Sequence, residues 1–186
     1  MVSGWLWNGQ KNGKGKEYNI NGKLIFEGEY LNGKRNGKGK EYNDFGQLKF
    51  EGEYLYDKKI KGREYYYNRK IKYEGEYFLY QKCNGKEYDL DGRLIFEGEY
   101  LNGKRNGKGK EYYSDGKIIF EGEYLNGKRN GKGKEYWNGL LRFEGEYLNG
   151  ERNGKGKEYY DNGKLEFEGE YLNGERNGKG KEWKNN

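Results

Sequence analysis

The chain has 186 residues, a formal net charge of +6 and a pI near 9.0. Its 37 basic residues face 31 acidic ones, a balance that does not resemble a dedicated nucleic-acid binder. Only 31% of the residues are apolar, too few for a conventional two-layer core of this length, although 18% are aromatic and 34 are Gly.

One phrase, FEGEYLNGKRNGKGKEY, recurs along the chain. Its opening, FEGEY or YEGEY, begins at residues 26, 50, 73, 96, 120, 143 and 167, and a divergent first copy begins near residue 2. A period of 23 or 24 residues predicts a stack of small units rather than a globule with one active site. We therefore interpret residues 1–186 as a single repeat array of about eight units, with divergent units over 50–95.

Each unit is predicted to be one β-hairpin. In the copy that begins at Phe26, the strands are expected over residues 24–31 and 37–42, with a turn over 32–36 between them. A second turn over residues 43–46 returns the chain to the next hairpin. The predicted fold is all-β: an elongated, single-layer, twisted antiparallel sheet built from stacked hairpins.

The alternation of side chains along a strand places Phe26, Gly28 and Tyr30 on one face. A turn at this position would give the cross-strand pairs Tyr30–Gly37, Gly28–Gly39, Phe26–Glu41, Glu29–Lys38 and Glu27–Lys40. The repeated glycines are explained most simply by packing beneath aromatic rings. The alternative is that they leave room for the backbone of a ligand in a groove, and both roles can coexist.

The phrase YEGEY-x-NGK-x-NG-x-G resembles the MORN (membrane occupation and recognition nexus) repeat. The matching residues in the second unit are Glu27, Gly28, Glu29, Tyr30, Asn32, Gly33, Lys34, Gly37 and Gly39. The stretch over residues 112–118 is similar to a variant repeat of bacterial antitoxin-like proteins. The chain departs from the family where Asn36, Asn106 and Asn130 replace the usual His, and where Tyr replaces the usual Trp of the first strand.

The resemblance implies long single-layer sheets with an aromatic groove, which serve as scaffolds and interaction modules at membranes or in cilia. We therefore expect a non-enzymatic scaffold that binds a protein segment along this groove. The groove residues are expected to be Phe26, Tyr30, Phe50, Tyr54, Tyr73, Tyr77, Phe96, Tyr100, Phe120, Tyr124, Phe143 and Tyr147.

The units over residues 50–95 lose a residue from each hairpin loop and gain large side chains. The departures that define a candidate divergent patch are Ile60, Tyr65, Tyr67, Phe78, Tyr80 and Cys83. Two interpretations stay open: drift that is repacked locally, or a docking surface or bend specific to this protein.

A row of cations is expected along the hairpin loops, at Lys34, Arg35, Lys58, Lys59, Lys104, Arg105, Lys128 and Arg129. This basic edge could simply be solvated. Alternatively it could hold the protein at an anionic membrane surface, and a third hypothesis is an antitoxin-like regulatory partner. Open terminal strands would also permit end-to-end self-association.

Catalysis is not expected, because the chain has no His and no nucleophile beside a base. No spacing typical of metal ligands occurs, so no cofactor is expected. The single Cys excludes an intrachain disulfide and favours a reducing compartment. With no apolar run near the roughly 20 residues of a membrane span, we expect a cytoplasmic protein. The cytoskeleton, the cilium and membrane surfaces are the locations that the family resemblance adds.

Overall fold

The computed structural model of the chain describes residues 2–7 and 9–185, with side chains described from residue 9 onward. Contacts divide the chain into two compact units, Met1–Arg93 and Leu94–Asn186. Within the described part, every helix or strand element is a β-strand, which confirms the predicted all-β class. None of the described residues form a helix long and apolar enough to cross a membrane.

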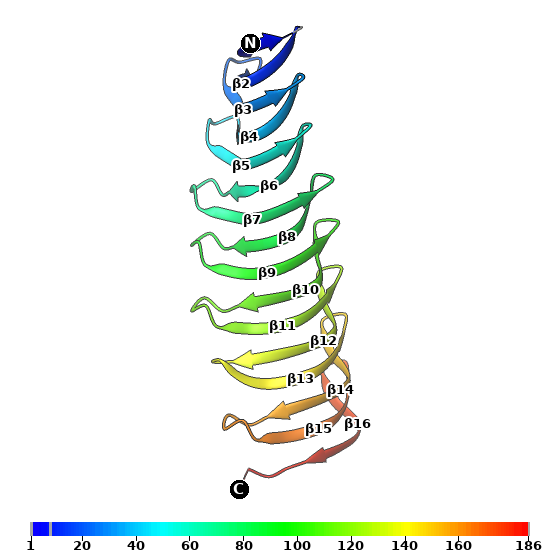
Figure 1. The fold of residues 1–186 in the computed structure, drawn as a ribbon. Coiled ribbons are helices and arrows are strands. Elements are labelled where there is room, and N and C mark those ends of the chain that lie inside the picture. Colours follow the sequence, from blue (N-terminus) through cyan, green and yellow to red (C-terminus); the bar gives the residue numbers. More distant parts are fainter. Residues whose placement is uncertain (1, 8, 186) are drawn as a thin grey trace. The chain divides into compact units, whose positions relative to one another are not determined.

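Each unit is an open single-layer sheet in which consecutive strands pair in antiparallel fashion (Figure 1). The strands of the first unit are β1 Val2–Trp7, β2 Gln10–Tyr18, β3 Leu24–Leu31, β4 Lys34–Tyr42, β5 Leu48–Leu55, β6 Lys58–Tyr65, β7 Ile71–Phe78 and β8 Gln81–Tyr88. Those of the second are β9 Leu94–Leu101, β10 Lys104–Tyr112, β11 Ile118–Leu125, β12 Lys128–Trp137, β13 Leu140–Leu148, β14 Glu151–Tyr159, β15 Leu165–Leu172 and β16 Glu175–Glu182.

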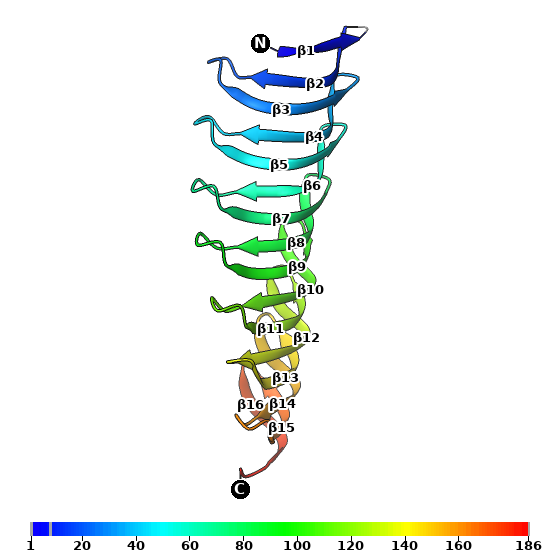
Figure 2. The ribbon, with the colours of Figure 1, turned by 60° about the vertical axis from the view of Figure 1, so that its left-hand side comes forward.

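The turn between β3 and β4 is shorter than predicted. β3 ends at Leu31 and β4 already begins at Lys34, so only Asn32 and Gly33 connect them. Their φ angles of 50° and 79° are those of a type I′ turn, which Asn-Gly adopts readily because both residues tolerate the left-handed region. We call the end of the strands that carries these turns the turn edge. Successive hairpins are joined at the other end, by longer loops except between β12 and β13, where only Asn138 and Gly139 connect the strands (Figure 2).

The predicted register is correct in the middle of the hairpin and wrong beside the turn. The pairs Phe26–Glu41, Glu27–Lys40 and Gly28–Gly39 are confirmed. Tyr30, however, lies opposite Arg35, and Gly37 pairs with Tyr54 of the next hairpin. Between the pairs Gly28–Gly39 and Tyr30–Arg35, β3 has one residue and β4 has three. Residues 36–38 therefore form a bulge in β4.

A side chain fills the bulge. The carboxylate of Glu29 accepts a hydrogen bond from the backbone N–H of Lys38 at 3.1 Å. A Cβ atom on Gly37 would lie only 2.0 Å from Oε2 of Glu29, and the φ of Gly37 is 96°. The expected Glu29–Lys38 side-chain pair is therefore absent, since Glu29 binds backbone instead.

The return loop between hairpins agrees with the prediction of a turn over residues 43–46. The side-chain oxygen of Asn43 accepts hydrogen bonds from the N–H groups of Phe45 at 3.0 Å and Gln47 at 2.9 Å. The N–H of Gly46 donates to the carbonyl of Asn43. Asn is suited to this position because its short amide side chain bonds the backbone two residues on.

A column of aromatic rings forms the core of each unit. Phe26 meets Tyr30 of its own strand edge to face at 5.6 Å and Tyr54 of the next hairpin at 5.3 Å. The Phe26 ring covers two glycines: added Cβ atoms at Gly28 and Gly39 would lie 2.8 and 2.4 Å from Cζ of Phe26. These contacts support the packing explanation of the repeated glycines.

We predict that Gly39→Ala lowers the free energy of unfolding by about 2–3 kcal/mol, because the new methyl group would overlap the Phe26 ring. The control is Gly33→Ala in the same hairpin, where the nearest atom to the new Cβ is 4.0 Å away. There only the left-handed backbone adds a cost, of about 1 kcal/mol. Urea unfolding of both variants measures the difference. Equal losses at the two sites would contradict the packing argument.

Candidate interaction surfaces

The predicted groove residues lie in the core. Among them, Phe26, Phe50, Tyr73, Phe96, Phe120 and Phe143 are 0% exposed, and Tyr30, Tyr54, Tyr77, Tyr100, Tyr124 and Tyr147 are at most 7% exposed. The rings therefore do not line an open groove. A partner that approaches this aromatic face would first meet the polar side chains that cover it.

Arginine and glutamate side chains cover the rings. The guanidinium carbon of Arg129 lies 4.2 Å from the centre of the Phe120 ring. Its nitrogens pair with Glu111 at 2.5 Å and with Glu135 at 3.2 Å. Because Glu111 is on β10, Phe120 on β11 and Arg129 on β12, the arginine bridges the strand whose ring it covers.

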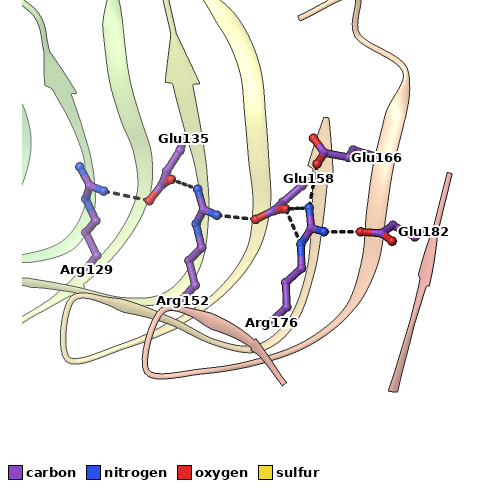
Figure 3. Close-up of polar contacts among 7 residues, drawn as sticks. All are labelled: Arg129, Glu135, Arg152, Glu158, Glu166, Arg176 and Glu182. Atoms are coloured by element: carbon purple, nitrogen blue, oxygen red, sulfur yellow. Dashed lines mark hydrogen bonds and ion pairs between the residues drawn. The ribbon is translucent and has the colours of Figure 1, made fainter. Parts of the chain in front are cut away.

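These contacts repeat as a ladder through the second unit (Figure 3). Arg152 pairs with Glu135 at 2.5 Å and Glu158 at 2.7 Å, and Arg176 continues from Glu158 to Glu182. In the first unit Arg35 occupies the equivalent place over Phe26, at 4.0 Å from the ring centre. Lysines replace the arginine in the divergent hairpins, with Lys59 over Phe50 and Lys82 over Tyr73.

The electrostatics of the ladder keep its carboxylates charged. Burial disfavours the ionised form of Glu17, but hydrogen bonds from Arg35 and Tyr30 outweigh it, so the pKa of Glu17 is lowered. The pKa of Glu41 is lowered likewise, with burial opposed by Lys59. Burial and the nearby Glu17 raise the pKa of Tyr30. These groups are fixed in their ordinary charge states, which suits a structural role.

The predicted basic edge divides in two. Its first members, Lys34, Lys58, Lys104 and Lys128, are exposed at the turn edge. Its second members, Arg35, Lys59, Arg105 and Arg129, lie over aromatic rings and pair with glutamates. About half of the expected cations are thus neutralised inside the fold.

The predicted divergent patch also separates. Phe78 and Tyr80 are 69% and 63% exposed at the turn edge, and Ile60 and Cys83 lie close to it in β6 and β8. Tyr65 instead lies at the far end of β6, where its hydroxyl donates a hydrogen bond to Glu51. Tyr42 makes the same contact with Glu27 in a regular hairpin. Tyr67 is exposed in the loop beyond β6.

The divergent hairpins keep the two-residue turn without its usual residues. The residue that they lack is missing from the bulge and not from the turn. In β6, only Ile60 interrupts the register between β5 and β6. Tyr56 and Asp57 form one turn, with φ of 47° and 68°, and Leu79 and Tyr80 form the next, with φ of 46° and 69°. This left-handed conformation is unfavourable for Tyr and Leu, whereas Asp tolerates it better.

The result is an exposed apolar cluster, which we call the turn patch: Tyr56, Phe78, Leu79 and Tyr80. Sequence reasoning did not include Tyr56 and Leu79 among the candidate residues. The signal that could have found them is the replacement of Asn-Gly at an obligatory turn. The Arg–Glu ladder was missed as well, although Arg and Glu recur six residues apart in each RNGKGKE copy.

The face opposite the aromatic rings carries the remaining Glu and Lys side chains. Lys16 pairs with Glu27 at 3.5 Å, and the hydroxyl of Tyr42 donates to Glu27 at 2.6 Å. Between two rows of such side chains runs a trough of about 1300 Å³ in the first unit and about 1070 Å³ in the second. Glu, Gly, Lys and one Arg line these troughs.

The described residues include no group of three or more His, Cys, Asp or Glu side chains placed to hold a metal ion. Burial raises the pKa of the Cys83 thiol. A raised thiol pKa reduces the thiolate fraction that a nucleophile needs.

Models of known families identify the repeat. The MORN repeat model matches residues 6–23, 26–45, 96–118, 120–139 and 167–186, which together make up more than half of the chain, and a MORN repeat variant matches 152–173. A search of curated proteins finds no match. The hairpins, their glycine-backed rings and their turns define a repeat protein built from β-hairpins, and the MORN repeat is a non-enzymatic repeat module. The chain belongs to the MORN repeat family.

For the ladder we predict that Arg35→Ala lowers the free energy of unfolding by about 2–3 kcal/mol, since two charge-assisted contacts and a cation–π contact are lost. Arg35→Lys should cost less, as lysine serves at this place in the divergent hairpins. Chemical denaturation measures the free energy of unfolding of both variants and of the unchanged chain. Repeating it over a range of pH tests whether the loss comes from the ion pairs.

The difference between Arg35→Ala and the unchanged chain should be full above pH 4.5, the ordinary pKa of Glu, because the folded pKa values of Glu17 and Glu41 are lowered. It should shrink as the pH falls through those lowered values and the carboxylates take up protons. A difference that does not change with pH would contradict the ion-pair explanation.

Proposed function

We propose that this chain is a non-enzymatic scaffold that binds a protein through the turn patch of its divergent hairpins. MORN repeats commonly serve as interaction modules at proteins or membranes, which is consistent with a scaffold role. The observation that carries the finer proposal is the pair of altered turns, in which the exposed residues Tyr56, Leu79 and Tyr80 stand where regular hairpins have Asn or Gly.

The two turns reduce stability. Tyr80 occupies the second turn position, where regular hairpins have Gly, at a cost of about 1–2 kcal/mol. Asp57 holds the same position at a smaller cost, because Asp tolerates the left-handed region and its carboxylate accepts a hydrogen bond from the backbone N–H of Arg35 at 2.8 Å. Burial returns little of this, because Tyr56, Leu79 and Tyr80 remain 52%, 58% and 63% exposed. Residues that lower stability without packing in the core are common where a protein binds a partner.

The chemistry of the patch indicates the kind of partner. Tyr and Phe dominate the energetics of protein interfaces. The ammonium of Lys34 lies 5.9 Å from the Tyr56 ring centre, and that of Lys58 lies 5.9 Å from the Tyr80 ring centre. A complementary segment would therefore present apolar side chains flanked by carboxylates.

A specific observation favours a second candidate, contact with an anionic membrane surface. At the turn edge of the second unit, the exposed leucines Leu101 and Leu125 precede the exposed lysines Lys104 and Lys128. Apolar side chains beside cations suit the interface of an anionic bilayer. Sedimentation with phosphatidylserine vesicles should then fall steeply with added salt, and equal sedimentation with neutral vesicles would exclude this candidate. An antitoxin-like regulatory partner would be one form of the protein-binding proposal.

The test of the turn patch uses peptides selected from a random display library on the full chain. Leu79→Asn together with Tyr80→Gly restores the Asn-Gly turn, so the free energy of unfolding should rise by about 1–2 kcal/mol. Affinity for the selected peptides should fall at least about tenfold, because two interface side chains are removed.

The matched control is Leu101→Ala, which truncates a residue 57% exposed at the turn edge of the other unit. It should leave the affinity unchanged. Selected peptides that bind the restored turn as tightly as the original, or a library that yields no binder, would count against the turn patch as the binding site.

A further inference from the structure

The two lysines of each Gly-Lys-Gly-Lys segment have different surroundings. The second lysine pairs across strands, as Lys110 does with Glu121 at 3.7 Å and Lys134 with Glu144 at 3.7 Å. The first lysine makes no ion pair with any residue that the structure describes, and it is exposed in every unit that has one. These first lysines are Lys14 and Lys38 in the first unit and Lys108, Lys132, Lys155 and Lys179 in the second; Lys61 holds the same place in β6, where the segment reads Ile-Lys-Gly-Arg.

The bulge explains why these ammonium groups are unpaired. Lys132 lies opposite Glu146 in the register of β12 and β13. The Glu146 carboxylate, however, accepts a hydrogen bond from the backbone N–H of Lys155 at 3.1 Å. Glu29 does the same to Lys38 in the first unit, although Lys14 is its cross-strand neighbour. The carboxylates of Glu29, Glu99 and Glu146 are thus bound to backbone N–H groups rather than to the ammonium of a first lysine.

The unpaired lysines form one regular row. Lys108, Lys132, Lys155 and Lys179 all line the trough of the second unit. They occur on every second strand, so with strands about 4.8 Å apart their backbone positions recur about every 9.6 Å along the trough. The rest of the lining consists of Glu, Gly and the second lysines. The second lysines Lys110, Lys134 and Lys157 each pair with a glutamate.

We propose that this trough binds an acidic peptide segment in the polyproline II conformation, with a carboxylate at every third position. This site is separate from the turn patch and does not depend on it. Polyproline II has three residues per turn and rises about 3.1 Å per residue, so every third side chain lies on the same face at intervals of about 9.3 Å. Each carboxylate would then meet one unpaired lysine.

Other conformations fit the row less well. Side chains on one face of a β-strand recur about every 6.7 Å, which misses alternate lysines. Side chains seven residues apart on an α-helix recur about every 10.5 Å. Over the three intervals between four lysines, their positions would drift from those of the lysines by nearly 3 Å. Every third side chain of polyproline II would drift from the lysine positions by only about 1 Å over the same distance. Flexible lysine side chains can adjust to a difference of this size.

The lining favours a peptide over a nucleic acid. Seven glutamates line the same trough, three of them directly across from an unpaired lysine on the neighbouring strand, and a strand with a phosphate at every nucleotide would meet them repeatedly. These seven are Glu97, Glu121, Glu123, Glu144, Glu146, Glu168 and Glu170. The trough lining includes no aromatic side chain on which a base could stack. A segment with one carboxylate every three residues matches the lysines and leaves neutral residues beside the glutamates.

The experiment titrates the full chain with a fluorescent Glu-Pro-Pro repeat peptide of about 15 residues and measures anisotropy at low salt. Lys132→Gln with Lys155→Gln should weaken binding about tenfold, because two adjacent contacts are removed. The matched control is Lys104→Gln with Lys128→Gln, which makes the same change of charge at the turn edge and should leave the affinity within about twofold. A Gln-Pro-Pro repeat should not bind measurably.

Several outcomes would overturn the proposal. One is an equal loss of affinity in the control pair, since that would show only a response to net charge. Another is equal binding of a peptide with the same composition in scrambled order, because the spacing argument would then fail. Tighter binding of a single-stranded oligonucleotide, lost in the trough pair, would assign the row to nucleic acid. Absence of binding by the Glu-Pro-Pro peptide would also count against it.

Discussion

The structure depends on the contact between an aromatic ring and the glycines of two paired strands. A single-layer sheet has no second layer against which to bury apolar side chains. Here the missing side chains of Gly28 and Gly39 leave a space that the Phe26 ring fills, at distances where a Cβ would overlap it. A guanidinium group covers the ring from outside. The core thus fits within one layer.

This arrangement also determines how stability and charge are distributed. Tyr54 touches Phe26 of the preceding hairpin and Phe50 of its own, so each hairpin completes the core of its neighbour. Stability should therefore be shared between adjacent repeats. The same contacts hold many of the cations in place over rings. The charge available to a partner is consequently smaller than the composition indicates, and the surfaces that remain are the turn edge and the trough.

Much of the fold could be predicted because its signals are local. The period, the Asn-Gly turn and the alternation of side chains indicated the hairpin and the pairs Phe26–Glu41 and Gly28–Gly39. The turn was predicted too long, although Asn-Gly favours a two-residue turn. The bulge at Gly37 was not predicted, since the Glu29 carboxylate that fills it lies on the neighbouring strand. The aromatic residues were correctly grouped on one face. Their burial was missed, because it requires arginines from other strands to cover the rings.

The sequence by itself determined that the chain is a MORN repeat array of β-hairpins, since a period of this kind allows no globular alternative. It also marked residues 50–95 as different. Only the tertiary structure decided which charges are used internally and which remain for a partner. Arg35 and Lys38 are three residues apart and look equivalent in sequence, yet one is held over a ring by Glu17 and Glu41 while the other is unpaired at a trough. The reason is that the Phe26 ring beneath Arg35, its partner Glu17 and the Glu29 carboxylate bound at the bulge all come from other strands, which the sequence of β4 does not specify.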